Sequence, residues 1–124
     1  MDEVKLFTPK EATRALPLVK KIVEDILATS ECLRAVSSKM RRGAEKDPEV
    51  VKGMEQLEIL FEELESLGCY YKDWNFTIGL VDFPARLGEE EVFLCWRSDE
   101  LQIQFYHGVD SGYAERKKIP QEYL

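Results

Sequence analysis

His107 is the only histidine of this 124-residue chain, and it lies three positions before an acidic residue, Asp110. A turn at Gly108 would bring the imidazole and this carboxylate within hydrogen-bond reach. Asp82 or Asp73, from an earlier extended region, would complete a set of one histidine and two acids. Such a set suits a divalent metal, with His107 and Asp110 as ligands, or acid/base chemistry. The structural alternative is that His107 closes the edge of a sheet and Asp110 caps a turn.

A second candidate ligand site combines one arginine with two aromatic residues, Trp96, Arg97 and Tyr106. They would meet across a β-hairpin, where a guanidinium group over an aromatic face offers a place for a carboxylate or phosphate. The alternative is a cross-strand contact that only stabilises the hairpin. We favour this alternative because no Gly-rich loop accompanies the arginine.

The three cysteines, Cys32, Cys69 and Cys95, are widely spaced and form no C-x-x-C motif. This pattern predicts reduced, mostly buried thiols rather than disulfides or a thiolate metal site. Cys95 lies inside an apolar run, where burial would raise the thiol pKa and make it unreactive. We therefore predict no catalytic residue and no cofactor.

Two helices must precede and support these residues. The run Thr8-Pro9-Lys10-Glu11 is typical of a helix start, with Thr8 and Glu11 forming a capping box. Apolar residues then recur every three or four positions until Arg41-Arg42-Gly43, which would end the helix. Pro17 lies inside this stretch, so we expect a kink there or a separate short helix over residues 9–16.

The second helix starts at Asp47-Pro48 and covers about residues 48–67. The short connection over residues 43–47 predicts that the two helices pack as an antiparallel hairpin. Residues 10–42 hold 8 basic and 4 acidic residues, a net charge of +4, and residues 49–66 hold 1 basic and 6 acidic residues, a net charge of -5. These opposite charges favour the pairing.

Aromatic and β-branched residues after Gly68 predict a small antiparallel sheet of three or four strands over residues 69–107. The expected extended segments are 69–74, 76–83, 91–97 and 101–107, with a break at Asn75 or Gly79. Residues 91–97 are mostly apolar, as expected of a central strand covered on both faces. Residues 98–100 would form a short hairpin turn. Alternation over residues 101–107 places Leu101, Ile103, Phe105 and His107 on one face, so the ring of His107 should be buried and bonded to Asp82 or Asp110.

The whole chain is therefore predicted to be one α+β domain, residues 1–124, with a helical hairpin over 8–67, a sheet over 69–107 and a C-terminal tail over 108–124. The composition is 44% hydrophobic, which is enough for a core. The net charge of -7 argues against nucleic acid as a partner. No apolar run would span a membrane and the first residues do not form a signal peptide, so we expect a cytoplasmic protein.

Several stretches also resemble a known family. They are FTPKEA (7–12), GLVDFPA (79–85), LCWR (94–97) and FYHGVDSGYA (105–114). The chain resembles, over nearly its whole length, the prokaryotic family called domain of unknown function 2203. The resemblance implies a bacterial, cytosolic protein, and it implies no reaction because the family has no established activity.

The function we predict from the residues is non-enzymatic interaction or assembly through the helical hairpin. The alternative is a small-molecule or divalent-metal site around Asp82, His107 and Asp110, with an enzymatic role as one option. A helix of about 25 residues extends about 37 Å, whereas a strand of about seven residues extends about 23 Å, so the sheet cannot cover the hairpin. Doubled apolar positions widen the helix stripes and predict a homodimer, with an unknown protein partner as a further option. They are Ile22-Val23, Ile26-Leu27, Val50-Val51 and Leu60-Phe61.

Overall fold

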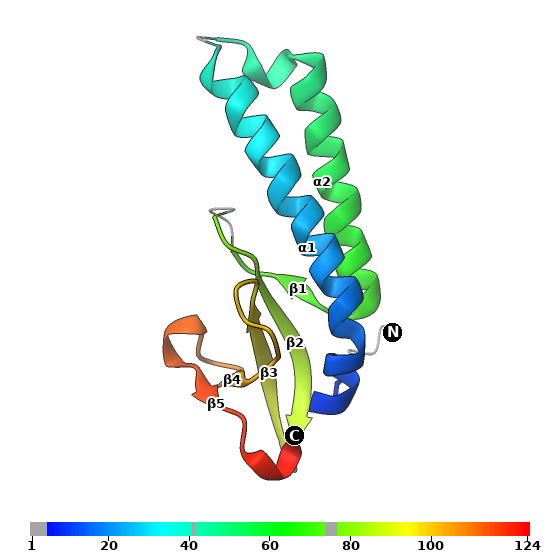
Figure 1. The fold of residues 1–124 in the computed structure, drawn as a ribbon, viewed down its shortest axis with the longest axis vertical. Helices are drawn as coiled ribbons and strands as arrows, with labels where there is room; N and C mark the ends of the chain where they lie inside the picture. The colour runs from blue at the N-terminus through cyan, green and yellow to red at the C-terminus, as the bar shows by residue number, and fades with distance from the viewer. Residues whose placement is uncertain (1–4, 41, 74–76) are drawn as a thin grey trace.

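The computed structural model describes residues 5–40, 42–73 and 77–124. Its helices are α1 (Pro9–Ser38) and α2 (Pro48–Leu67), with short 3-10 turns η1 (Ala44–Lys46), η2 (Tyr113–Glu115) and η3 (Gln121–Tyr123). Its strands are β1 (Tyr70–Tyr71), β2 (Leu80–Leu87), β3 (Glu90–Arg97), β4 (Phe105–Gly108) and β5 (Lys117–Lys118). The strands form one antiparallel sheet in the order β1-β2-β3-β4-β5 (Figure 1). The α+β class is confirmed, with five strands instead of three or four.

The first helix begins as predicted. The Thr8 hydroxyl accepts from the Glu11 amide at 3.1 Å, and the Glu11 carboxylate accepts from the Thr8 amide at 2.9 Å. Of the two alternatives at Pro17, the separate helix over residues 9–16 is wrong, because α1 continues through Pro17 to Ser38. Pro17 is exposed, so water can reach the carbonyl that lacks a donor one turn earlier. The helix also ends before the predicted Arg42, and Arg41 lies outside the described residues.

The second helix has the predicted bounds, Pro48–Leu67. The Asp47 carboxylate accepts from the amides of Glu49 and Val50 at 2.9 and 3.3 Å, which satisfies two free donors of the first turn. Gly68 ends the helix with a φ of 94°, a left-handed conformation that glycine adopts without strain. The two helices lie side by side and antiparallel (Figure 1).

The sheet packs against only one end of the helix pair. In Figure 1 the upper part of α1 and α2 projects beyond the sheet, while the lower part lies against it. The core cluster accordingly draws on α1 only from Ala12 to Ile26 and on α2 from Leu57 to Leu64. We call residues 30–38 of α1 and 48–61 of α2 the far half of the pair. Neither described helix is long and apolar enough to cross a membrane.

Within the sheet, β3 is the central strand, as its apolar sequence predicted. The strand β2 runs to Leu87, beyond the predicted end at Phe83, because it pairs with β3 as far as Glu90, and Phe7 bridges to Ala85 of β2. The Phe7 amide donates to the Pro84 carbonyl at 2.7 Å and its own carbonyl accepts from the Arg86 amide at 3.2 Å. The predicted ends at Trp74 and Phe76 and the break at Asn75 lie outside the described residues.

The predicted strand over residues 101–107 is too long, because β4 covers only Phe105–Gly108. Leu101 is 85% exposed rather than sharing a buried face with Ile103. The indole nitrogen of Trp96 donates to the Glu100 carbonyl at 2.9 Å, and the Lys20 ammonium donates to the Leu101 carbonyl at 3.1 Å. The predicted turn at residues 98–100 forms, with the Glu100 amide donating to the Arg97 carbonyl at 2.8 Å, but the connection then continues to residue 104 before β4 begins. The C-terminal tail over residues 108–124 adds the short strand β5, which pairs with β4, and two 3-10 turns.

Candidate functional site

A buried polar cluster lies on the face of the sheet that points away from the helices. The neighbouring strand positions Val81, Phe83, Leu94 and Trp96 point into the helix-covered core. Side chains alternate along a strand, so Asp82 and Cys95, which pair across β2 and β3, point to the opposite face. His107 of β4 pairs with Phe93 on that same outer face. We call Asp82, Cys95 and His107 the outer-face cluster.

His107 and Asp82 are in direct contact within this cluster. The His107 Nε2 atom lies 3.0 Å from the Asp82 Oδ2 atom, and the two side chains are only 5% and 6% exposed. The other ring nitrogen, Nδ1, lies 2.9 Å from the Gly108 carbonyl oxygen. A carbonyl oxygen only accepts, so Nδ1 carries a proton and donates it. The predicted burial of His107 and its bond to an acid are therefore confirmed, with Asp82 as the partner.

Cys95 joins the pair from the central strand. One donor atom each from Asp82, Cys95 and His107 lie within 4.8 Å of one another, and all three residues are buried. Burial raises the pKa of the Cys95 thiol to about 12, helped by the nearby carboxylate of Asp82. Burial also raises the pKa of Asp82, and His107 opposes this shift. Both nitrogens of His107 bond to other groups, so the imidazole does not activate the thiol as a nucleophile.

A pocket of about 280 Å³ opens next to His107 and Asp82. Its other walls come from β1 to β4 and from the segment after β4, namely Lys72, Leu80, Phe93, Val109, Ser111, Gly112 and Tyr113. The Ser111 amide donates to the Gly108 carbonyl at 3.1 Å, which folds this segment back beside the cluster. The outer-face cluster is thus buried and still adjoins a space large enough for a small molecule.

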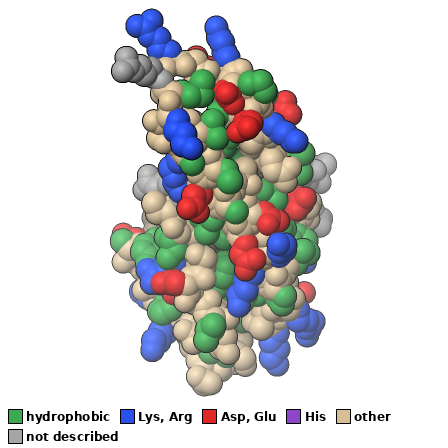
Figure 2. Space-filling model, turned by 45° about the horizontal axis from the view of Figure 1, so that its top comes forward, with side chains coloured by type: hydrophobic (Ala, Val, Ile, Leu, Met, Phe, Trp, Pro, Cys, Tyr) green, Lys and Arg blue, Asp and Glu red, His purple; other side chains and the backbone are tan. Residues whose placement is uncertain are grey.

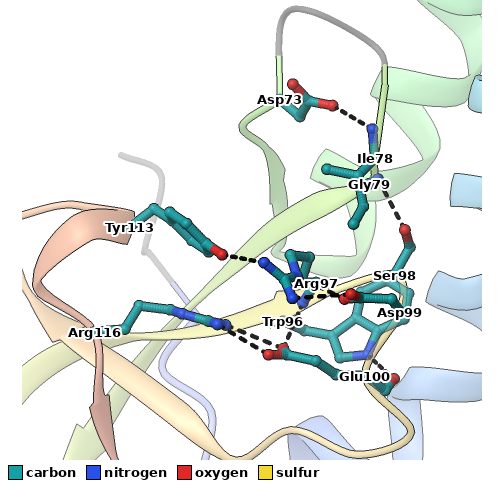
Figure 3. Close-up of polar contacts among 10 residues, drawn as sticks. All are labelled: Asp73, Ile78, Gly79, Trp96, Arg97, Ser98, Asp99, Glu100, Tyr113 and Arg116. Carbon is teal, nitrogen blue, oxygen red and sulfur yellow. Dashed lines mark hydrogen bonds and ion pairs between the residues drawn. The ribbon is translucent and has the colours of Figure 1, made fainter.

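The other two acids predicted beside His107 lie elsewhere. Asp110 is exposed on the surface turn, and the pocket wall next to His107 is formed by Ser111 instead. One carboxylate oxygen of Asp73 accepts from the amide of Thr77 at 3.0 Å and from that of Ile78 at 2.9 Å, the second bond being drawn in Figure 3. The sequence spacing of His107 and Asp110 did not bring them together, because the turn after Gly108 carries the acid outward.

The predicted group of Trp96, Arg97 and Tyr106 is divided between the two faces of the sheet. Trp96 is 1% exposed in the core, and Tyr106 also packs against that core. Arg97 instead binds both carboxylate oxygens of Asp99, at 2.6 and 2.9 Å, and donates to the hydroxyl of Tyr113 (Figure 3). Its guanidinium group is already occupied by a carboxylate of the chain.

Arg116, which the sequence did not single out, lies beside Arg97 in the same network (Figure 3). It donates to both carboxylate oxygens of Glu100 at 3.1 and 2.9 Å, with both side chains less than 15% exposed. Its guanidinium carbon lies 4.2 and 4.5 Å from the ring centroids of Phe105 and Tyr113. These contacts attach the C-terminal segment to the sheet and hold Tyr113 at the pocket wall.

The far half of the helix pair carries a different kind of surface. A groove of about 250 Å³ runs between the helices there, and we call it the distal groove. It is lined by Ser30, Leu33, Arg34, Met54, Leu57, Glu58 and Phe61. Met54 is 53% exposed, and Val51 and Ile59 nearby on α2 are 42% and 50% exposed. Figure 2 shows hydrophobic side chains between the charged ones along this helical part of the molecule.

The comparisons with known proteins identify a family and no activity. The family described as uncharacterized conserved protein (DUF2203) matches residues 5–119. No curated protein and no solved structure matches the chain. The match covers most of the sequence, including both helices, the outer-face cluster and β5, and the chain therefore belongs to the DUF2203 family.

Proposed function

We propose that the protein is an assembly module that forms a homodimer through the far half of its helix pair. The distal groove carries this proposal, because it is an apolar surface that the sheet covers only at one end, where Phe61 packs against Tyr71 of β1. Apolar groups that stay in contact with water favour association, and helix pairs commonly bury them in four-helix bundles. The proposal places this assembly in the cytoplasm, where the three free cysteines stay reduced.

A second copy of the chain fits the groove better than an unrelated apolar peptide would. Two-fold symmetry makes the same surface meet itself, so each contact occurs twice. Arg34 from α1 and Glu58 from α2 line the groove, so it presents charges of both signs to a second copy. The net charges of +4 over residues 10–42 and -5 over residues 49–66 favour packing of α1 against α2 of the other copy.

The contact surface is narrower than the doubled apolar positions suggested. Ile22 and Val23 are buried within the chain itself, at 4% and 1% exposure, and so is Leu60 at 3%. They contribute to the fold rather than to association. The residues that remain for a partner are Val51, Met54 and the half-buried Leu33 and Phe61.

Sedimentation equilibrium at tens of micromolar tests this proposal. We expect the wild-type chain to have twice its 14.4 kDa mass. Met54→Glu places a carboxylate in the groove and should weaken dimerisation at least about tenfold, since burying an unpaired charge costs several kcal/mol. Gln56→Glu adds the same charge at an exposed position that does not line the groove, and should leave the mass unchanged.

Circular dichroism will verify that both variants fold. A wild-type mass of 14.4 kDa at these concentrations would overturn the proposal. Equal dimerisation of Met54→Glu and Gln56→Glu would also overturn it, because the interface would then lie elsewhere.

A further inference from the structure

We propose that Asp82, Cys95 and His107 form a binding site for one divalent transition-metal ion, with Zn²⁺ as the preferred ion. This inference is independent of the proposed dimer, since the cluster lies on the outer face of the sheet and the distal groove lies between the helices. It revises the ligand set expected from the sequence: Cys95 takes the place of Asp110.

The donor set selects the class of ion. A thiolate and an imidazole favour Zn²⁺ and similar borderline ions, whereas Mg²⁺ and Ca²⁺ require oxygen ligands. The charges also balance, because a thiolate, a carboxylate and a neutral imidazole together neutralise an ion of charge +2. A buried site with no net charge avoids most of the cost of taking ions out of water.

The geometry requires little movement. Zinc bonds of about 2.0–2.3 Å in a tetrahedron separate the ligand atoms by about 3.3–3.8 Å. The Nε2 and Oδ2 atoms are 3.0 Å apart, and all three donor atoms lie within 4.8 Å. Shifts of less than about 1 Å, within the range of side-chain adjustment, would bring the three to zinc distances.

The imidazole is already oriented for the metal. Metal-binding histidines usually donate their second ring nitrogen to a carbonyl or carboxylate, which fixes the tautomer. His107 makes this bond from Nδ1 to the Gly108 carbonyl, so Nε2 faces Asp82 and Cys95. Metal binding would release the thiol proton and the proton shared between Nε2 and Oδ2 to solvent.

The surrounding charges do not oppose a cation strongly. The guanidinium group of Arg116 lies close enough to Cys95 to lower the pKa of its thiol, and two hydrogen bonds to the Glu100 carboxylate offset its positive charge. Lys72 also lines the pocket, but its side chain is exposed to solvent. The carboxylate of Asp82 is the buried charge closest to the ion.

Three protein ligands leave a fourth position on a tetrahedral ion. The pocket of about 280 Å³ adjoins His107 and Asp82, so water or an oxygen atom of a small ligand can occupy this position. The site thus has the composition of an open zinc site rather than that of a closed structural one.

Titration of chelator-treated protein with Co²⁺ tests this inference. Cobalt bound by a thiolate has an absorption band from sulfur-to-metal charge transfer, which reports on the ligand itself. We expect the wild type to develop this band up to one equivalent of Co²⁺ and to lose it when one equivalent of Zn²⁺ is added. Elemental analysis should then find one zinc per chain after dialysis.

Matched variants assign the ligands. Cys95→Ala should abolish the band, whereas Cys69→Ala, which removes another buried thiol on the helix side, should retain it. Asp82→Asn preserves the shape of the side chain and should weaken metal binding at least about tenfold. Even residues that only hydrogen-bond to a metal ligand change metal affinity by about that factor when they are mutated. Asp110→Asn should bind like the wild type.

Absence of the band in folded wild type would overturn the inference. Retention of the band by Cys95→Ala would overturn it as well, since the thiolate would then come from elsewhere. Circular dichroism of each variant separates loss of ligand from loss of fold, and Asp82→Asn keeps the test valid if Cys95→Ala is unstable. A monomeric protein that still binds cobalt would refute the proposed dimer and leave this site intact.

Discussion

The far half of the helix pair and the outer face of the sheet bury opposite kinds of groups. The far half leaves apolar side chains such as Met54 in contact with water, while the outer face buries the polar side chains of Asp82 and His107. The exposed apolar side chains are spread along two neighbouring helices, whereas the polar cluster takes one residue from each of three strands. Covering the apolar side chains of the far half with another protein surface would remove them from water and so lower the free energy. The buried polar side chains of the outer face are instead stabilised when they bind a proton or another ligand.

The largest effect should come from comparing the covered and uncovered parts of α2. Leu64 is fully buried in the near half of α2, residues 62–67, so Leu64→Ala should lower the free energy of unfolding by about 2–5 kcal/mol. Met54 is 53% exposed, and Met54→Ala should change the stability of the monomer by about 0.5 kcal/mol or less. Urea unfolding at low protein concentration measures both. Similar losses would show that the far half is as tightly packed as the near half.

The outer-face pair should show strong coupling in metal-free protein. Asp82→Ala leaves the Nε2 atom of His107 buried without its partner, which should cost about 1–3 kcal/mol, and His107→Ala should cost a similar amount. The double variant should cost less than the sum, with a coupling of about 0.5–3 kcal/mol. A double-mutant cycle by urea unfolding measures this coupling. Additive losses would mean that the two side chains do not stabilise each other.

Two glycines that contact α1 give a further comparison. A Cβ atom at Gly79 would lie 2.2 Å from Cγ1 of Val23, which is 1% exposed and β-branched, so Gly79→Ala should cost about 1–3 kcal/mol. A Cβ atom at Gly53 would lie 2.5 Å from Cδ2 of the half-buried Leu33. That methyl group can move, and alanine is favoured over glycine in a helix by about 1 kcal/mol.

We therefore expect Gly53→Ala to stay within about 1 kcal/mol of the wild type, because the helix gain offsets the adjustment of Leu33. Thermal unfolding of the two variants under identical conditions measures the difference. The far half would be more rigid than its exposure suggests if Gly53→Ala were as destabilising as Gly79→Ala.

The thiols give an effect that is absent at neutral pH and develops only above pH 9. Burial raises the pKa of Cys69 from 9.0 to about 12. A raised thiol pKa stabilises the folded state fully below pH 9, and this contribution is lost as the pH rises toward 12. The free energy of unfolding of the wild type should thus fall between pH 9 and 12. The decrease should be smaller in Cys69→Ala, which lacks this thiol. At neutral pH a thiol reagent should label Cys32 alone in the folded protein, and rapid labelling of two or three thiols would contradict the burial of Cys69 and Cys95.

The sequence predicts the helices well because their signals are local. Capping residues such as Thr8 and Asp47 act within one turn, and the apolar period follows from the helix geometry. The separate helix expected over residues 9–16 does not form. The free energy that the exposed Pro17 costs is smaller than the free energy that a continuous helix gains by packing. The central position of β3 was also predictable from its apolar residues.

The candidate site was predictable only in part, because strand register decides which side chains meet. His107 and Asp82 were identified by residue type, and their contact depends on β2 and β4 both pairing with β3. Cys95 appeared inert from its apolar neighbours, yet the register places it opposite Asp82. The turn at residues 98–104 depends on Glu100 contacting both Arg97 and Arg116, the second of which lies 16 residues further along.

We propose that association and metal binding belong to separate regions of the molecule. Sedimentation equilibrium of the wild type, with one equivalent of Zn²⁺ and after treatment with a chelator, examines both regions in one experiment. We predict twice 14.4 kDa under both conditions. A mass of 14.4 kDa under both conditions, or a dimer only in the presence of zinc, would contradict the claim.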